Sequence, residues 1–406
     1  MKNILILLFV FSTYLFSNNT EYAGGFSDAK QCLSCHSDQA HDWQTTWHSK
    51  SHYDSNPLYK SVVDYMSKVK YQPKETILVQ CAQCHNPTMS VKKIENEDSF
   101  ALAKVFDVET SQTKIVDDSI SDTKIKTGIS CVICHRVDKV HESTNLKMRG
   151  YEAVEWVKGN VIVGPYDSEE RTVFHNSQKR EHFVNPNKLC LVCHYGSENE
   201  QKIKLYATGE EYNEYSGAED KQTCAQCHMS SEKKGIIAPQ IIRGGTTPIV
   251  RNLRSHLFAG ARNSDILKNT FSINASSSEN DKLIINIKNL TPHSAPTGFS
   301  ARSIELKIDF LNGSTIIDTK VIKFESTYQD RHNKETLAYL ANSLKSDTRI
   351  KPYEVKKYRV NKPNNAKIAN IYITYRLVNE NILKQLGLKD PIFTKEYPMN
   401  FLKVEL

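Results

Sequence analysis

Cys190-Leu-Val-Cys193-His194 is one copy of the pattern that determines how this 406-residue chain folds. In every copy two cysteines are separated by two residues, and a histidine follows directly. The chain has ten cysteines, and all of them belong to such copies. The five copies are Cys32-Leu-Ser-Cys35-His36, Cys81-Ala-Gln-Cys84-His85, Cys131-Val-Ile-Cys134-His135, Cys190-Leu-Val-Cys193-His194 and Cys224-Ala-Gln-Cys227-His228.

This pattern is the attachment signal for c-type haem. Two thiols about one turn apart add to the vinyl groups on one edge of the porphyrin, and the imidazole that follows binds the iron. Thioredoxin-like sites and structural zinc sites also use paired cysteines, but neither predicts five identical units that each end in histidine. The sequence therefore predicts five covalently attached haem c groups, with proximal iron ligands His36, His85, His135, His194 and His228.

The N-terminus has the layout of a secretory signal. Lys2 precedes an apolar run of thirteen residues from Ile4 to Phe16, and small polar residues follow. Thirteen residues are short for a membrane span, although an uncleaved anchor is the alternative. We expect a signal peptide at residues 1–17 and export to the periplasm.

Composition and charge exclude several classes of protein. Hydrophobic residues make up 39% of the chain and charged residues 24%, which is ordinary for a globular protein. The mean hydropathy of −0.51 argues against a polytopic membrane protein. The formal net charge is +7, but each ferric haem would add about −1, so five haems would bring the chain close to neutrality. We therefore expect no nucleic-acid partner.

The motif-bearing part of the chain is expected to be mainly α-helical or irregular. The segment Pro57–Lys70 has a helical pattern, and the polar segments at 95–98 and 117–126 are expected to be loops. Because the haems themselves would form most of the interior, short helices suffice. We predict a pentahaem cytochrome c module at residues 24–262.

Beyond residue 266 the pattern changes to apolar and polar residues in alternation, which is typical of β-strands. Asn312-Gly313-Ser314 supplies a turn between two of the alternating segments. We predict an all-β domain, an antiparallel sandwich, at residues 266–406. The alternating segments are Asp281–Asn289, Arg302–Phe310, Thr315–Phe324 and Ile368–Val378.

Several stretches carry a resemblance to a known family. The first motif continues as Cys32-Leu-Ser-Cys-His-Ser-Asp-Gln-Ala-His-Asp-Trp43, and His48 follows it. The third motif reads Thr127-Gly-Ile-Ser-Cys131-Val-Ile-Cys-His135, and His141 follows shortly after. Both resemble multihaem cytochromes of the cytochrome c-554 and c-prime type. Later stretches resemble larger multihaem relatives that append a β-domain, and they are Phe174–Ser177, Cys224–Met229, His256–Gly260, Asn289–Gly298 and Asp347–Pro352.

The resemblance implies periplasmic electron transfer, often alongside oxidoreductases of nitrogen or sulfur compounds. It also implies that His48 and His141 each complete the haem of another motif. The smaller members of the family have neither a fifth haem nor a β-domain. Their function therefore cannot be assigned to this chain in full.

Nine histidines remain as candidates for the distal side of the haems. His141 lies only six residues after His135, so it is expected to serve a neighbouring haem. Residues four apart share one helix face, so only one of His48 and His52 is expected to bind iron. His175 and His182 pose the same choice. We predict the distal ligands His48, His141, His175, His256 and His293; the weaker alternatives are the methionines Met66, Met89, Met148 and Met229.

His293 is an unusual candidate, because it lies in the predicted β-domain. Pro292 precedes it, and the turn Pro296-Thr-Gly298 follows. Prolines stiffen the loop and would hold the imidazole at a fixed place. His41 and His332, by contrast, are expected to be surface residues or to bond haem propionates.

Three functions fit these patterns. The preferred one is an electron carrier with mostly bis-histidine haems, which works between periplasmic redox proteins or quinol-linked membrane complexes. The second is an oxidoreductase for hydroxylamine, nitrite or sulfur oxyanions, in which the haem at Cys81 has an open iron. The third is a self-associating subunit of a conductive filament.

Overall fold

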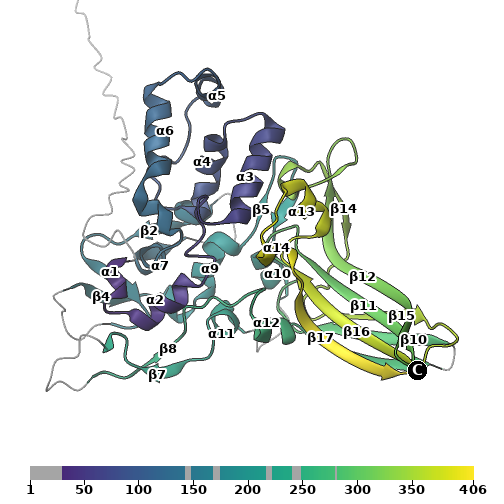
Figure 1. The fold of residues 1–406 in the computed structure, drawn as a ribbon. Helices are drawn as coiled ribbons and strands as arrows, with labels where there is room; N and C mark the ends of the chain where they lie inside the picture. The colour runs from purple at the N-terminus through teal and green to yellow at the C-terminus, as the bar shows by residue number, and fades with distance from the viewer. Residues whose placement is uncertain (1–29, 142–147, 168–173, 216–221, 240–247, 279–280) are drawn as a thin grey trace, which may run out of the picture.

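Figure 1 shows the computed structural model, which describes residues 30–141, 148–167, 174–215, 222–239, 248–278 and 281–406. A helical region carries all five motifs, and an antiparallel β-region extends from it to one side (Figure 1). This arrangement confirms the predicted fold class. The expected signal peptide at residues 1–17 and the expected module start at residue 24 lie outside the described residues, and the domain boundaries stay a prediction.

Short helices joined by long connections build the helical region. α3 spans Pro57–Lys70, as the sequence predicted. The Asn56 side chain caps it by accepting a hydrogen bond from the backbone N–H of Tyr59 at 3.0 Å. In the described parts of the chain, every helix is too short or too polar to traverse a bilayer. The remaining helices here are α1 (Lys30–Leu33), α2 (Ser37–Gln44), α4 (Lys74–His85), α5 (Glu97–Val105), α6 (Ser111–Ser121), α7 (Cys131–His135), α8 (Glu181–Val184), α9 (Asn187–His194), α10 (Thr208–Glu214), α11 (Cys224–His228) and α12 (Ser264–Lys268).

The two polar segments expected to be loops are partly helical, and that prediction was wrong. α5 begins at Glu97 within the first segment, and α6 continues to Ser121 within the second. Asn96 caps α5 by accepting a hydrogen bond from Ser99 N–H at 2.9 Å. Polar residues mark helix ends and exposed helix faces as well as loops, so polarity alone did not separate these cases.

Among the described residues, four small two-stranded ladders join the connections between the helices. Three of the ladders are antiparallel and one, β3 with β4, is parallel. The strands are β1 (Val137–Val140) with β2 (Val154–Trp156), β3 (Val161–Gly164) with β4 (Asn176–Lys179), β5 (Ser197–Glu198) with β6 (Lys204–Tyr206), and β7 (Lys233–Gly235) with β8 (Arg251–Leu253).

In the described part of the β-region, the strands form two antiparallel sheets. The smaller sheet has the order β15 (Val355–Asn361), β10 (Lys282–Asn289), β9 (Phe271–Ser278). The larger has the order β13 (Glu335–Thr336), β12 (Thr315–Gln329), β11 (Ser303–Asn312), β16 (Ile368–Arg376), β17 (Tyr397–Glu405), and β14 (Ser343–Asp347) also pairs with β12. Two short helices, α13 (Glu380–Leu386) and α14 (Pro391–Thr394), precede the last strand.

Alternation of side chains along the strands builds the core of the sandwich. Ile285 on β10 is fully buried, as are Leu306, Ile308 and Phe310 on β11. All belong to one apolar core, which confirms that the period-two pattern marks buried faces. Gly313 has φ +63° in the turn between β11 and β12, a conformation that glycine adopts without strain.

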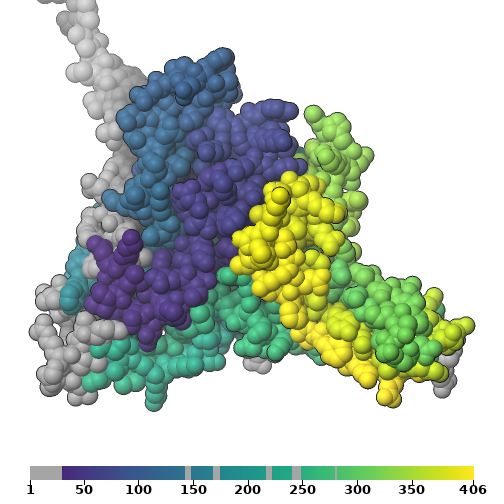
Figure 2. Space-filling model, viewed as in Figure 1, coloured from purple at the N-terminus to yellow at the C-terminus, as the bar shows by residue number. Residues whose placement is uncertain are grey.

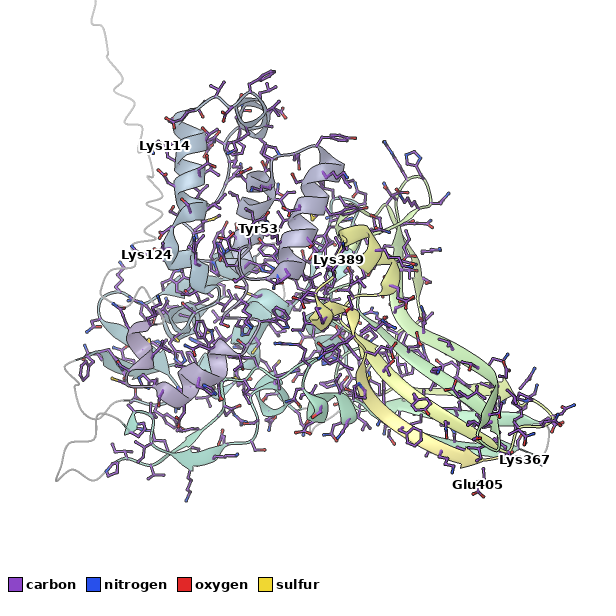
Figure 3. The ribbon with its side chains drawn as sticks, viewed as in Figure 1. Tyr53, Lys114, Lys124, Lys367, Lys389 and Glu405 are labelled. Carbon is purple, nitrogen blue, oxygen red and sulfur yellow. The ribbon has the colours of Figure 1, made fainter. Side chains whose placement is uncertain are left out.

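The same core continues into the helical region. Val63 and Met66 on α3 belong to the apolar core of the sandwich. The Trp47 ring stacks on Phe393 of α14, with ring centres 5.7 Å apart. Figure 2 shows the yellow C-terminal segment packed against the purple N-terminal helices, and Figure 3 places Lys367 and Glu405 at the end of the sandwich remote from them. The two regions are therefore packed together rather than merely tethered.

Replacement of Phe310 by alanine tests the importance of the sandwich core. We expect the free energy of unfolding to fall by about 3–5 kcal/mol, because a fully buried aromatic ring leaves a cavity. Phe401 on β17 is 59% exposed and serves as the matched control, for which Phe401→Ala should cost about 1 kcal/mol or less. Denaturant titration followed by circular dichroism measures both. Equal losses would show that Phe310 contributes no more than a surface ring.

Candidate haem-binding site

Helical turns present each pair of motif cysteines on one face. α4 and α9 end at the histidines of their motifs, while α7 and α11 consist of a motif alone. The first motif begins in α1, and His36 N–H donates to the Cys32 carbonyl at 2.9 Å. Residues three apart lie on the same side of a helical turn. All ten thiols are free in this structure, so the paired cysteines do not form disulfides.

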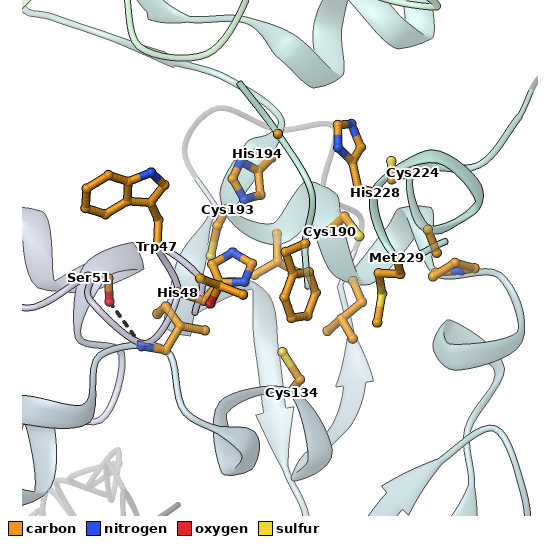
Figure 4. Close-up of a pocket in the computed structure, with 18 of the residues that line it drawn as sticks. Trp47, His48, Ser51, Cys134, Cys190, Cys193, His194, Cys224, His228 and Met229 are labelled. Atoms are coloured by element: carbon orange, nitrogen blue, oxygen red, sulfur yellow. Dashed lines mark hydrogen bonds between the residues drawn. The ribbon is translucent and has the colours of Figure 1, made fainter. Parts of the chain in front are cut away.

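All five motifs line one large cavity. Its volume is about 2740 Å³, and its walls contain all ten cysteines. A pocket for one drug-sized ligand is about 300–1,000 Å³, so this cavity has space for several large groups. Figure 4 shows part of it, with Cys134, Cys190, Cys193 and Cys224 around a common space. Nine histidines also line it: His36, His48, His85, His135, His175, His194, His228, His256 and His293.

Backbone carbonyl groups orient most of the proximal histidines. His85 Nδ1 lies 3.2 Å from the Ser51 carbonyl oxygen, and His135 Nδ1 lies 2.8 Å from that of Val163. His36 and His228 make the equivalent contact with other carbonyl oxygens, at 3.2 and 2.5 Å. A carbonyl oxygen only accepts, so Nδ1 carries the proton and Nε2 keeps its lone pair. Metal-bound histidines are usually oriented in this way.

Four proximal histidines each face a second histidine ring. The pairs are His36 with His175 (ring centres 6.3 Å apart), His194 with His48 (6.1 Å), His135 with His256 (6.1 Å), and His228 with His293 (6.5 Å). A metal–nitrogen bond is about 2 Å long, and the imidazole centre lies roughly 1 Å behind the nitrogen, so two rings that share one metal ion have centres about 6 Å apart. The donor set therefore fits four bis-histidine haem irons.

Burial keeps these imidazoles in the form that binds metal. Burial, followed by the charge of the facing His194, lowers the pKa of His48 to about 3. Burial also lowers the pKa values of His135 and His194 to about 4. The rings are neutral at physiological pH, and neutral imidazole is the metal ligand.

His85 differs from the other four proximal histidines. Among the described residues, no second histidine ring faces it at a comparable distance. The Tyr59 ring of α3 instead stacks on His85, with ring centres 4.2 Å apart and planes 12° from parallel. Burial, followed by the electrostatic interaction with Cys81, raises the pKa of Tyr59 well above its usual range. Sequence reasoning missed Tyr59, because an aromatic residue at helical spacing looks like an ordinary core residue.

The structure places His141 apart from the site, although the sequence predicted it as a distal ligand. Its Nε2 lies 3.3 Å from a carboxylate oxygen of Glu155, and its side chain is 41% exposed. Its backbone N–H donates to the Ala153 carbonyl, so the pairing of β1 with β2 holds it away from the cavity. His141 does not line the cavity.

The other spare histidines also remain outside the cavity. His48 and His52 do not share a helix, because α2 ends at Gln44. His52 is buried, and its Nδ1 accepts from Asp54 N–H at 3.1 Å. His182 is buried and lies next to Phe183, and His41 and His332 are exposed, as expected.

Contacts between cysteines of different motifs connect the attachment sites. A hydrogen bond with Cys32 lowers the pKa of Cys131, so the first and third motifs touch. A hydrogen bond with Cys193 lowers the pKa of Cys84, which joins the second motif to the fourth. In the same way, a hydrogen bond with Cys224 raises the pKa of Cys190 and joins the fourth motif to the fifth.

Cys134 of the third motif and Cys193 of the fourth line the same cavity (Figure 4). Because all ten cysteines line this one cavity, the five attachment sites form one connected set.

Comparisons with known proteins agree with this geometry. Residues 31–111 match the family described as cytochrome c554 and c-prime. The fold is similar to that of a penta-heme cytochrome c552 from Thermochromatium tepidum, with a TM-score of 0.68 and 16% identity over 93% of this chain and 98% of that one. No curated protein matches the sequence.

Two further solved structures match only about a third of the chain. They are the putative ApaA protein from Bordetella pertussis, with 14% identity over 33% of this chain and 89% of that one, and structural genomics target SoR45, with 14% identity over 34% and 86%. Their TM-scores of 0.17 and 0.16 support no conclusion. The first two findings confirm the resemblance seen in the motifs: residues 31–111 match the cytochrome c554 and c-prime family, and the chain has a fold similar to that of a penta-heme cytochrome c552.

Proposed function

We propose that this protein is an exported pentahaem c-type cytochrome that moves electrons between periplasmic redox partners. The observation that carries the proposal is the set of four facing histidine pairs around one cavity lined by all ten motif cysteines. Two imidazoles on one iron leave no position for a substrate and favour outer-sphere electron transfer. The fold similarity to a penta-haem cytochrome supports the same function.

Each side chain has a defined role in this proposal. The paired cysteines hold the haems through thioether bonds, and the backbone carbonyl groups orient the proximal rings. Haem, when bound, supplies one-electron oxidation and reduction. The proposed distal ligands are His175 for the haem of the first motif, His256 for the third, His48 for the fourth and His293 for the fifth.

A second candidate function rests on His85. Because no second histidine faces it in the described residues, the iron of the Cys81-Cys84 haem would keep a position for a small ligand. Tyr59 stacks on the imidazole face rather than across the ring from its free nitrogen. This arrangement favours an oxidoreductase of hydroxylamine, nitrite or a sulfur oxyanion, in which the four bis-histidine haems would supply or remove electrons.

The proposed partners are soluble redox proteins or quinol-linked membrane complexes. The connected attachment sites suit a protein that accepts electrons at one place and releases them at another. Self-association into a filament stays a sequence-based hypothesis, since no described contact favours it.

Intact mass tests the haem count. We expect five haem increments on each mature chain after extraction with acidified acetone, because every cysteine belongs to a complete motif. Thioether bonds survive this extraction, whereas haem held only by histidine is lost. Fully matured protein that carries four increments or fewer would contradict the proposed stoichiometry.

Electron paramagnetic resonance of the ferric protein tests the ligation. We expect four low-spin irons and one high-spin iron, since four proximal histidines face a partner and His85 does not. His256→Ala should convert one low-spin iron to high-spin, because it removes the ring opposite His135. His141→Ala is the matched control and should leave the count unchanged, because His141 is paired with Glu155 outside the cavity.

Steady-state assays separate the carrier from the oxidoreductase. As a carrier, the protein should exchange electrons rapidly with small redox partners but turn over hydroxylamine, nitrite or tetrathionate no faster than free haem does. Turnover at enzyme-like rates, together with binding of an added ligand to the high-spin iron, would favour the second candidate. A count of five low-spin irons would exclude it.

A further inference from the structure

The loop that carries His293 is held on its own side by one buried amide. Asn289, at the end of β10, is fully buried. Its side-chain N–H groups donate to the His293 carbonyl at 2.8 Å and to the Ile350 carbonyl at 3.0 Å, and its side-chain oxygen accepts from Thr291 N–H at 3.0 Å. Such multiple bonds fix the start of the loop within the β-region.

The other half of the loop is held from the helical region. Glu211 lies on α10, and its Oε2 accepts from Ser294 N–H at 3.1 Å and from the Thr297 hydroxyl at 2.7 Å. Its Oε1 accepts from Arg349 Nη1 at 2.7 Å. All three donors belong to the β-region, so one carboxylate of the helical region joins two segments of the sandwich.

Because these side chains are largely buried, loss of these contacts would be energetically costly. The Glu211 side chain is only 10% exposed and that of Arg349 only 22%. A buried carboxylate is costly unless a charge partner and hydrogen bonds replace the water that it loses. Glu211 therefore finds its partners only when the sandwich is docked with the His293 loop in place.

We propose that Glu211 is a positioning residue for His293, so that docking of the sandwich and ligation of the fifth haem occur together. The bond to Ser294 N–H fixes the peptide that directly follows His293. His293 Nδ1 in turn lies 3.0 Å from the Ser294 carbonyl oxygen, so Nε2 is the nitrogen left to bind metal, and the ring centre lies 6.5 Å from that of His228. This inference rests on the proposed role of His293 as a ligand.

The neighbouring residue on the same helix provides a matched control. Glu210 forms an ion pair with Lys204 at 2.8 Å, and its side chain is 15% exposed. Both partners of this pair belong to the helical region, and it does not involve the His293 loop. Glu210→Ala and Glu211→Ala thus remove carboxylates of similar burial from α10, but only the second removes a contact with the sandwich.

The experiment measures spin state in the full-length, haem-loaded protein. Glu211→Ala should raise the number of high-spin ferric irons by one, and added imidazole should restore the low-spin signal. Glu211→Gln keeps an acceptor oxygen but loses the charge opposite Arg349, so a partial conversion is expected. Glu210→Ala should leave the spin count unchanged. Limited proteolysis should release the sandwich faster from the Glu211→Ala protein than from the Glu210→Ala protein.

A further variant separates failure of this inference from failure of the ligand assignment. If His293→Ala leaves every low-spin iron intact, His293 is not a ligand and the assignment in the proposed function is wrong. If His293→Ala converts one iron but Glu211→Ala converts none, the ligand assignment stands and the positioning role is overturned. Conversion of one iron by both variants, with Glu210→Ala unchanged, supports both.

Discussion

The facing imidazole pair is the constraint on which the helical region depends. In the proposed bis-histidine arrangement, two rings whose centres lie about 6 Å apart would bind one iron from opposite sides of a haem, and residues far apart in the chain must meet to form such a pair. His36 and His175 belong to the first and second halves of the helical region, and His48 faces His194 across a similar gap in sequence. The short helices, the small ladders and the carbonyl contacts all serve to hold these rings in place.

The same constraint explains why the two regions form one unit. His293 comes from the loop between β10 and β11, yet it faces His228 of α11 in the helical region. The apolar core that extends from α3 into the sandwich and the ion pair between the buried Glu211 and Arg349 hold that loop against the helices. Removal of the sandwich would expose apolar surface and leave a buried charge without its partner, both of which are unfavourable.

The sequence predicted the elements whose signals are local. Helix α3 was expected at Pro57–Lys70 and is found there, and the four alternating segments coincide with β10, β11, β12 and β16. Periodicity succeeds in these segments because each strand or helix buries one face against a single core. Polarity, by contrast, was misleading at α5 and α6, where polar residues form caps and an exposed helix face rather than loops.

The sequence by itself predicted the attachment chemistry, because both thiols and the imidazole of each motif lie within five consecutive residues. It also determined the β character of the second half, because alternation is a property of neighbouring residues. Only the tertiary structure decided which histidine faces which, that His141 is paired with Glu155 at the surface, and that Tyr59 stacks on His85. These contacts join residues remote in sequence, and their geometry depends on how whole helices and sheets pack, a property that no short stretch of the chain contains.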